Sequence, residues 1–327
     1  MYVLYGAMGS PYSMKMRAVL RYWRAPFLMR SAMGGAGAIA HIRPPIIPVV
    51  HTPQDEWLVD STPMIEHLDP ILGQKRTVIP SNPVLEFLSY LFEDFADEWL
   101  TKVMFGYRWG NDLDARIFAV QGCYDILGTV GHKKLETYAK LFEQRQKDRM
   151  NMVGCTDQNM DLLAQTLDDL IVAMNEQIPE QRFLFGSRPS RADFALYGQL
   201  SQLCSDPTPS ARICDMSPLF HRWVTQCGDL SAVEGEWREG SLSAAATMLL
   251  RLCVEIYVPF LIANEAAYQS RSELSVILRG THFRQPSFKY QTKCLAELKK
   301  RYAQIGHSDQ GLLTQQLIDS GLHKLLT

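Results

Sequence analysis

The chain has 327 residues, of which 46% are hydrophobic, and its 33 Lys and Arg nearly balance its 35 Asp and Glu, giving a formal net charge of −2. This length and apolar content are enough for two domains, each with its own core. No large basic field is present, so a nucleic-acid-binding role would lack its electrostatic driving force, and the seven scattered cysteines form no CxxC pair, which predicts reduced thiols in a cytoplasmic protein and offers no zinc-binding pattern.

The N-terminal segment predicts a β-α-β unit. Residues 2–7 are short, apolar and β-prone, and residues 26–32 read as a second strand. Between them, residues 12–24 place apolar side chains at helical spacing, with Lys15 on the opposite, polar side. A strand, a helix and a strand within about thirty residues are typical of a parallel pair with a right-handed crossover.

A Ser-Pro pair, Ser10 and Pro11, stands between the first strand and this helix. Ser before Pro is a common helix start, because Ser caps free backbone N–H groups and Pro fits the first turn. The same pair would also present a hydroxyl at a helix N-terminus, where the aligned backbone dipoles favour an anion. The local sequence is compatible with both interpretations.

Residues 34–45 are too rich in glycine to predict a helix, and a β-hairpin with strands over 46–51 and 56–59 is expected after them. Pro48 cannot donate a hydrogen bond to a strand ladder. This favours a special backbone geometry there, such as a cis bond, over an ordinary trans strand start. A helix then begins at Ser61, which we predict to be its N-cap.

The rest of the chain is predicted to be mostly helical. A long helix over 83–109 has an aromatic and leucine face, and Ser190 to Asp193 have the spacing of a capping box before an apolar helix. The apolar stretch 244–263 is interrupted by charged residues and a proline, which favours a buried helix over a membrane span. Further elements are expected as helices within 112–149, over 159–178 and over 291–304, and as a strand over 274–278.

Four segments, in this order along the chain, carry a family resemblance. They are SPYS at 10–13, IIPVV at 46–50, VDSTPMIEHLD at 59–69 and FLFGSRPSRADFALYGQL at 183–200. Together they resemble the catalytic segment, the cis-proline segment, the glutathione-binding segment and the capping-box helix of glutathione S-transferases of the bacterial type. The resemblance implies an α+β, thioredoxin-like glutathione-binding domain with a mixed four-stranded sheet over 1–78, an all-α domain over 82–235, and a helical extension with a short strand or hairpin over 240–327.

The resemblance also implies a catalytic residue. Ser10 would use its hydroxyl and the helix N-terminus to stabilise the thiolate of glutathione, the nucleophilic form of a thiol whose ordinary pKa is about 8.5. Ser13, one turn further on, would line the glutathione site or only cap the helix. Because Ser10 stands where thiol-transferring relatives carry cysteine, and a hydroxyl cannot form a mixed disulfide, glutathione-dependent disulfide reduction is disfavoured.

Two further segments are expected to hold the glutathione backbone. Ile47, ahead of Pro48, would bind the cysteinyl part through its backbone N–H and C=O groups. Asp60 would accept from the γ-glutamyl ammonium, and Ser61 with its helix N-terminus would hold the carboxylate. The alternative is that Ser61 only caps its helix and Asp60 is a solvated turn residue. The family more often has Glu at position 60, so the shorter Asp reaches less far.

The glycyl carboxylate of glutathione needs a cation, and His41 and Arg43 are the nearest candidates in the sequence. Arg43 is the preferred one, with a solvated surface arginine as the alternative. The segment that contains both residues is shorter than the second helix of the family.

The electrophile is expected between the first domain and the long helix 83–109. Arg108 would polarise a leaving group, while the aromatic residues would form an apolar wall or only part of a core. The acidic run over 93–98 would be a solvated face or would line a dimer cleft. The predicted substrate-binding residues are Tyr12, Phe105, Tyr107, Arg108 and Trp109.

Two functions are therefore compatible with the sequence. The first is a cytoplasmic, homodimeric glutathione transferase that serves detoxification, uses glutathione as co-substrate without a metal, and attacks a small hydrophobic electrophile. The second is a non-catalytic, glutathione-transferase-like binding or scaffold protein, which the short segment 34–45 and the extension after residue 240 favour. No nucleic acid or membrane partner is expected.

Overall fold

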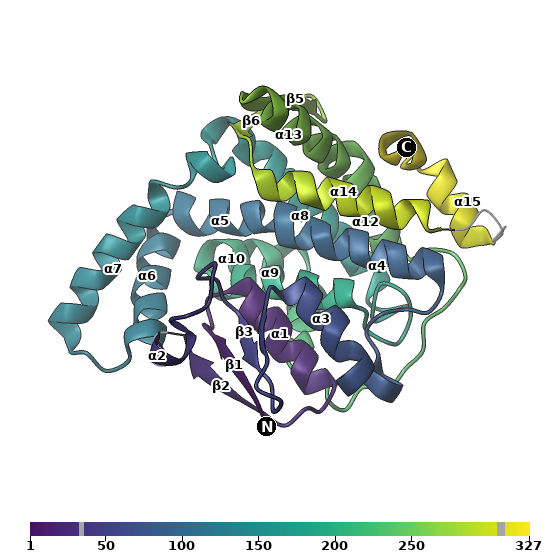
Figure 1. Ribbon diagram of the computed structural model, residues 1–327. Helices are drawn as coiled ribbons and strands as arrows, with labels where there is room; N and C mark the ends of the chain where they lie inside the picture. The colour runs from purple at the N-terminus through teal and green to yellow at the C-terminus, as the bar shows by residue number, and fades with distance from the viewer. Residues whose placement is uncertain (33–35, 306–310) are drawn as a thin grey trace. The chain divides into compact units, whose positions relative to one another are not determined.

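The computed structural model describes residues 1–32, 36–305 and 311–327 (Figure 1). They form two compact units. The first contains Met1–Ile79, Tyr107–Asp148 and Phe194–Glu234, and the second contains Pro80–Gly106, Arg149–Asp193 and Gly235–Thr327. These units group segments by packing, so the contiguous domains expected over 1–78, 82–235 and 240–327 stay a prediction. Residues 34 and 35 of the glycine-rich segment lie outside the described residues.

The first unit begins with a mixed four-stranded sheet. Its strand order is β2-β1-β3-β4. Strand β1 (Tyr2–Gly6) pairs parallel with β2 (Phe27–Ser31) and antiparallel with β3 (Val49–His51), which pairs antiparallel with β4 (Trp57–Val59). Helix α1 (Pro11–Tyr22) connects the parallel strands, and α3 (Ser61–Leu68) follows β4. The α+β, thioredoxin-like fold predicted for this part of the chain is confirmed.

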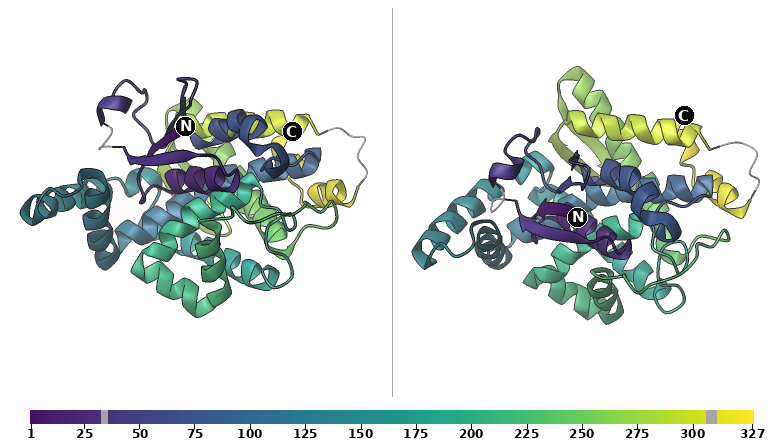
Figure 2. Two further views of the ribbon diagram at one scale, coloured as in Figure 1. Left: turned by 90° about the horizontal axis from the view of Figure 1, so that it is seen from below. Right: turned by 60° about the horizontal axis from the view of Figure 1, so that its bottom comes forward.

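Helices complete the first unit. Helices α6 (Asp112–Leu127) and α7 (His132–Lys147) lie side by side in every view (Figures 1 and 2). Helices α5 (Thr101–Gly110) and α9 (Arg191–Ser205) contribute residues to both units. The remaining elements of this unit are α2 (Ala36–Ile39), the π-helix η1 (Asp69–Gly73), the 3-10 helix η2 (Gln74–Arg76), α10 (Pro207–Met216) and α11 (Pro218–Cys227).

The second unit is mainly helical. It starts with α4 (Pro83–Phe95) and the π-helix η3 (Ala96–Leu100), so the long helix predicted over 83–109 is present with a π segment in its middle. The predicted strand at 274–278 is one arm of a hairpin. The other elements are the 3-10 helix η4 (Asn151–Val153), α8 (Asp157–Gln177), α12 (Ala244–Leu252), the π-helix η5 (Cys253–Tyr257), α13 (Val258–Ser270), β5 (Glu273–Leu278), β6 (Thr281–Pro286), α14 (Lys289–Ala303), α15 (Leu312–Asp319) and α16 (His323–Leu326).

The continuous helix Ala244–Ser270 is the only one among the described residues long and apolar enough to cross a membrane, on length and composition alone. Most of its most apolar stretch, 61%, is buried in the fold. Leu249, Ile256 and Phe260 have no exposed area, which agrees with the predicted buried helix.

Candidate functional site

Ser10 lies where the sequence predicts it, at the start of α1. It has extended backbone dihedral angles and acts as N-cap: its Oγ accepts a hydrogen bond from Ser13 N at 3.3 Å, and Pro11 is the first helical residue. The Ser10 side chain is half-buried, so part of it remains accessible. The hydroxyl therefore caps the helix and at the same time stands at its N-terminus.

Ser13 does not face solvent. It has no exposed area, and its Oγ accepts from Ala7 N at 3.3 Å. A Cβ atom on Gly6 would lie 2.6 Å from the Ser13 Oγ, so strand β1 approaches this hydroxyl closely. The hydrogen bond to Ser13 holds the segment after β1 against helix α1. Because Ser13 is buried, it does not contact glutathione in this conformation.

The peptide bond between Ile47 and Pro48 is cis, as the sequence suggests. Ile47 is half-buried and Pro48 is buried just before β3. The backbone of Ile47 therefore lies at the start of a strand that pairs with β1, the strand that leads to Ser10.

Asp60, rather than Ser61, is the N-cap of α3. An Asp60 carboxylate oxygen accepts from Thr62 N at 3.3 Å, while Ser61 is the first helical residue and is only 3% exposed. The prediction placed the cap one residue too late, because Asp and Ser are both good caps and stand side by side. Asp60 also has a φ of 69°, a left-handed conformation that non-glycine residues seldom adopt and that is often found at functional sites.

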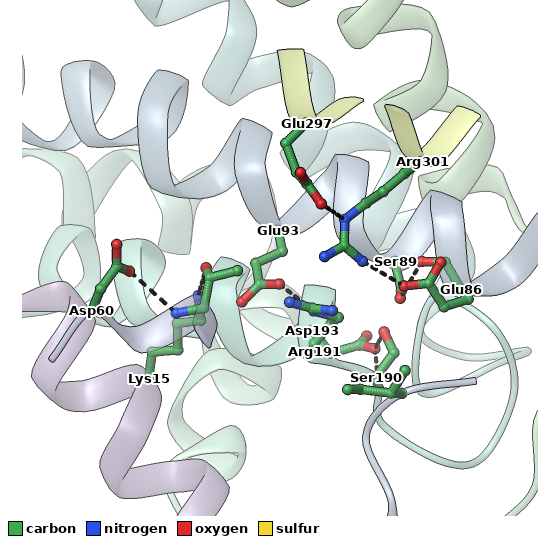
Figure 3. A network of polar contacts seen from close by, with 12 residues as sticks. Lys15, Asp60, Glu86, Ser89, Glu93, Ser190, Arg191, Asp193, Glu297 and Arg301 are labelled. Atoms are coloured by element: carbon green, nitrogen blue, oxygen red, sulfur yellow. Dashed lines mark hydrogen bonds and ion pairs between the residues drawn. The ribbon is translucent and has the colours of Figure 1, made fainter. Parts of the chain in front are cut away.

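Lys15 is a site residue that the sequence analysis placed wrongly. It was expected on the polar side of α1 but has no exposed area, because α3 and α9 cover that side as well. Its Nζ donates to Thr62 Oγ1 at 3.5 Å, and Figure 3 shows the amine pointing toward the Asp60 carboxylate. Gly198 permits the close approach of α9, since a Cβ there would lie 2.7 Å from the Pro11 carbonyl oxygen. The position of Lys15 between two apolar residues, Met14 and Met16, is the sequence feature that could have indicated its burial.

The two candidate cations for the glycyl carboxylate are already engaged. The exposed Arg43 donates from Nη1 to the carbonyl oxygens of Ala40 and Ile42, both at 2.7 Å. The His41 ring packs edge-on against Trp57, with ring centroids 4.8 Å apart. Both bonds of Arg43 use Nη1, and a guanidinium group carries further N–H donors on Nε and Nη2.

The predicted role of Arg108 at the electrophile is wrong. Its guanidinium group is 2% exposed, and Nε donates to an Asp206 carboxylate oxygen at 2.7 Å. Burial lowers the pKa of Arg108 and raises that of Asp206, and the charge of each partner opposes both shifts. A buried and fully paired cation cannot reach a leaving group.

The aromatic residues predicted to form an apolar wall differ in burial and in the unit to which they belong. Trp109 is 2% exposed and packs edge-on against Phe118 and Phe142, so it belongs to the core of the first unit. Tyr12 and Tyr107 are half-buried in the first unit, and Phe105 belongs to the second unit. Substrate contacts of these three residues stay a prediction.

Phe118 on α6 is a residue that the sequence analysis missed. Its ring lies directly against Gly9, where an added Cβ would be 2.3 Å from the ring. Phe118 is half-buried, and Gly9, against which its ring lies, directly precedes Ser10 in the chain. No spacing in the sequence of α6 indicates this contact, because it depends on how α6 packs in the first unit.

In the second unit, the acidic run 93–98 is not the solvated face expected from the sequence. Glu93 has no exposed area and pairs with the equally buried Arg191 (Figure 3). Asp97 is 8% exposed, and Asp94 accepts from the Tyr257 hydroxyl at 2.6 Å. Burial raises the pKa of Asp94 to about 7. Within the described residues, no group of three or more His, Cys, Asp or Glu side chains is arranged to hold a metal ion.

The predicted capping box is present in this unit. Asp193 accepts from the backbone N–H of Ser190 at 2.8 Å and from that of Leu184 at 3.0 Å. Burial raises the pKa of Asp193 to about 6, although these hydrogen bonds oppose the shift.

Residues 4–76 match the family model of the glutathione S-transferase N-terminal domain. This part of the chain therefore resembles the N-terminal domain of glutathione S-transferases. The match covers the segment that contains Ser10, the cis-proline and Asp60, which are the elements of the site in the first unit. No curated protein sequence matches the chain.

Solved structures of glutathione transferases and of a beta-etherase resemble the chain weakly. A Tau class enzyme from mango, Mangifera indica, is 15% identical, with 71% of this chain and 92% of that chain covered and a TM-score of 0.46. The beta-etherase LigF from Sphingobium sp. strain SYK-6 is also 15% identical, with 69% and 93% covered and a TM-score of 0.49. A Pseudomonas fluorescens Pf-5 family member with bound glutathione is 16% identical, with 69% and 93% covered and a TM-score of 0.37. Likenesses of this size do not bear on the chemistry of the site.

Proposed function

We propose that this protein is a glutathione transferase in which the Ser10 hydroxyl donates a hydrogen bond to the glutathione sulfur. The observation that carries the proposal is the half-buried Ser10 at the N-cap of the twelve-residue helix α1, in the connection that follows β1. The predicted small hydrophobic electrophile, the homodimer, the cytoplasmic location and the role in detoxification belong to the same proposal.

Capping and thiolate binding are compatible in Ser10. A hydroxyl has one donor and two acceptor lone pairs, and the cap to Ser13 N uses an acceptor pair. The O–H proton can therefore be donated to a thiolate. A hydrogen bond to a charged partner contributes about 1.5–3 kcal/mol, and the helix N-terminus adds to it. Together these effects would shift a thiol with an ordinary pKa of about 8.5 toward the thiolate at neutral pH.

The N-terminus of α3 is suited to the γ-glutamyl end. Its backbone N–H groups favour a carboxylate, and Asp60 carries the negative charge that an ammonium group needs. The Lys15 amine points toward the Asp60 carboxylate from the buried side, so Asp60 would lie between an internal cation and the ligand ammonium. The backbone of Ile47 would pair with the cysteinyl part, as an extended peptide pairs with a strand edge.

One observation favours the second function, a non-catalytic binding or scaffold protein. Arg43 Nη1 donates to two backbone carbonyls, which holds the guanidinium group in place and restricts its approach to a glycyl carboxylate. Weak glutathione binding is the expected signature of this alternative.

The test compares Ser10→Ala with Ser217→Ala. Ser217 also precedes a proline and caps a helix, α11, by accepting from Phe220 N at 3.0 Å, but it has no exposed area. Calorimetry measures glutathione binding, and the absorbance of the thiolate near ~240 nm, a generic thiolate band, measures the pKa of the bound thiol. We expect Ser10→Ala to raise that pKa by about one to two units and Ser217→Ala to leave it unchanged. No binding at millimolar glutathione, or an unshifted pKa in Ser10→Ala, would contradict the proposed function.

A further inference from the structure

The turn that presents Ser10 runs from Ala7 to Ser10. Ser10 N donates to the Ala7 carbonyl oxygen at 3.1 Å, which closes a β-turn with Met8 and Gly9 at its centre. Ala7 N donates to Ser13 Oγ at 3.3 Å. Neither bond uses the carbonyl oxygens of Met8 and Gly9. The Ser10 N–H bond orients the Gly9 carbonyl, which belongs to the same planar peptide unit, whereas the orientation of the Met8 carbonyl depends on another partner.

Both carbonyls accept hydrogen bonds from side chains of distant helices in the same unit. Gln202 on α9 donates from Nε2 to Met8 O at 3.1 Å, and Arg108 on α5 donates from Nη1 to Gly9 O at 3.3 Å. In a trans peptide the C=O and N–H groups point in opposite directions. Gln202 therefore also fixes where the Gly9 N–H group points, and Arg108 supports the direction that the turn already gives to the Ser10 N–H group.

The two donors are themselves held rigidly. Arg108 is 2% exposed and Gln202 is 3% exposed, and Arg108 Nη2 donates to Gln202 Oε1 at 3.0 Å. Asp206 binds the guanidinium from one side, and the Phe118 ring covers it, with its centroid 3.5 Å from the guanidinium carbon. A buried ion pair adds little stability over an apolar pair of the same size, and its best-attested use is to specify one arrangement.

We propose that Arg108 and Gln202 are positioning residues for Ser10. They direct the carbonyl dipoles of Met8 and Gly9 toward α5 and α9, and so keep the negative ends of these dipoles away from the sulfur beside Ser10. Without these two hydrogen bonds, a carbonyl oxygen of the turn could face the thiolate, and the proton affinity of the thiolate would rise. The inference rests on the proposed function of Ser10, and neither side chain needs to touch glutathione.

The variant Gln202→Glu tests this role with a small change of shape. The carboxylate keeps an acceptor for Arg108 but has no N–H to donate to Met8 O. Gln226→Glu, an exposed position on α11, makes the same chemical change and serves as control. We expect Gln202→Glu to raise the pKa of the bound glutathione thiol by about one unit, which is tenfold less thiolate well below the pKa, with glutathione affinity changed by less than about threefold. A purely structural loss would instead weaken binding or lower the melting temperature without moving the thiol titration.

A double variant shows whether Gln202 acts through Ser10. In Ser10→Ala the added Gln202→Glu change should move the thiol pKa by less than half of its effect in the wild-type protein, because residues that act as one unit are not additive. Additive shifts, or a wild-type pKa in Gln202→Glu, would overturn the inference while the function of Ser10 stands. An ordinary thiol pKa in the wild-type protein would overturn both. If Gln202→Glu does not fold, Arg108→Lys serves as the second variant. It keeps the positive charge but has no planar set of N–H donors for both Gly9 O and Gln202 Oε1, and it must also raise the thiol pKa.

Discussion

The protonation of Asp94 should make the stability of this protein depend on pH in a direction opposite to that of most carboxylates. Asp94 lies in the last turn of α4, accepts from the Tyr257 hydroxyl at 2.6 Å, and has Glu93 and Asp97 as acidic neighbours. Burial is the main reason why its pKa rises from 3.8 to about 7, and the hydrogen bonds of Tyr257 and Cys294 oppose the shift only in part.

The sign follows from proton binding. Between pH 3.8 and about pH 7 the folded protein holds a proton on Asp94 that the unfolded chain releases. The free energy of unfolding therefore decreases as the pH rises through this window, and the full contribution of the proton is present only below it. At about 1.36 kcal/mol for each pKa unit, the loss reaches about 4 kcal/mol above pH 7. Asp94 keeps some exposed area, where water solvates its charge. The loss of about 4 kcal/mol is therefore an upper bound, and we expect a loss of about 2 kcal/mol.

Asp94→Asn isolates this effect, because an amide keeps an acceptor for Tyr257 and cannot ionise. Urea unfolding of both proteins at pH 4, 6 and 8, followed by circular dichroism, gives the difference in the free energy of unfolding. The variant should match the wild-type protein at pH 4 and be about 2–4 kcal/mol more stable at pH 8. Asp161→Asn on the exposed side of α8 is the matched control and should give no such trend. A difference between Asp94→Asn and wild type that stays flat from pH 4 to pH 8 would refute the reasoning.

Three further changes test the packing described above. Gly9→Ala should destabilise the protein by about 1–3 kcal/mol, because its Cβ would meet the Phe118 ring at 2.3 Å, and Phe118→Leu should recover part of this loss in urea unfolding. Glu93→Gln should cost about 3–5 kcal/mol, because it leaves Arg191 charged and buried without its partner. Replacing both members of that pair by Met should cost clearly less than Glu93→Gln, and an equal or larger cost would contradict the buried-pair argument. Ser217→Ala should lower stability by about 1 kcal/mol, measured as the change in urea midpoint at constant slope.

Local signals in the sequence were sufficient for the sheet and for the ends of several helices. Residues 2–7 are apolar and β-prone, and all but the last of them form β1. Pro48 could not join a strand ladder, and its peptide bond is cis. Asp193 stands three residues after Ser190 and bonds its backbone N–H. Each of these features depends on contacts within a few residues, which is why the sequence alone predicts them.

The errors concern charged residues whose surroundings come from distant parts of the chain. Lys15 and Arg108 were expected to face solvent or substrate, yet both are buried. Gly198 of α9 packs against Lys15, and Asp206, the N-cap of α10, pairs with Arg108. A helical period shows that a residue is on the less apolar side of its helix, but it does not show whether another helix covers that side. Phe118 was missed for the same reason, since its contact with Gly9 joins segments more than one hundred residues apart in the sequence.

The chain uses the Ser-Pro helix start twice, and the comparison shows how far local sequence can define the site. Ser10 and Ser217 both precede a proline, and both accept from the backbone N–H three residues later, at 3.3 and 3.0 Å. Ser217 is fully buried, whereas Ser10 keeps exposed area beside a turn whose two central carbonyls are held by other helices. The four residues that start with the serine therefore determine the cap. The tertiary contacts of the preceding turn determine whether the hydroxyl can bind a ligand. A thiolate site at Ser10 accordingly depends as much on α5 and α9 as on the segment that contains the serine.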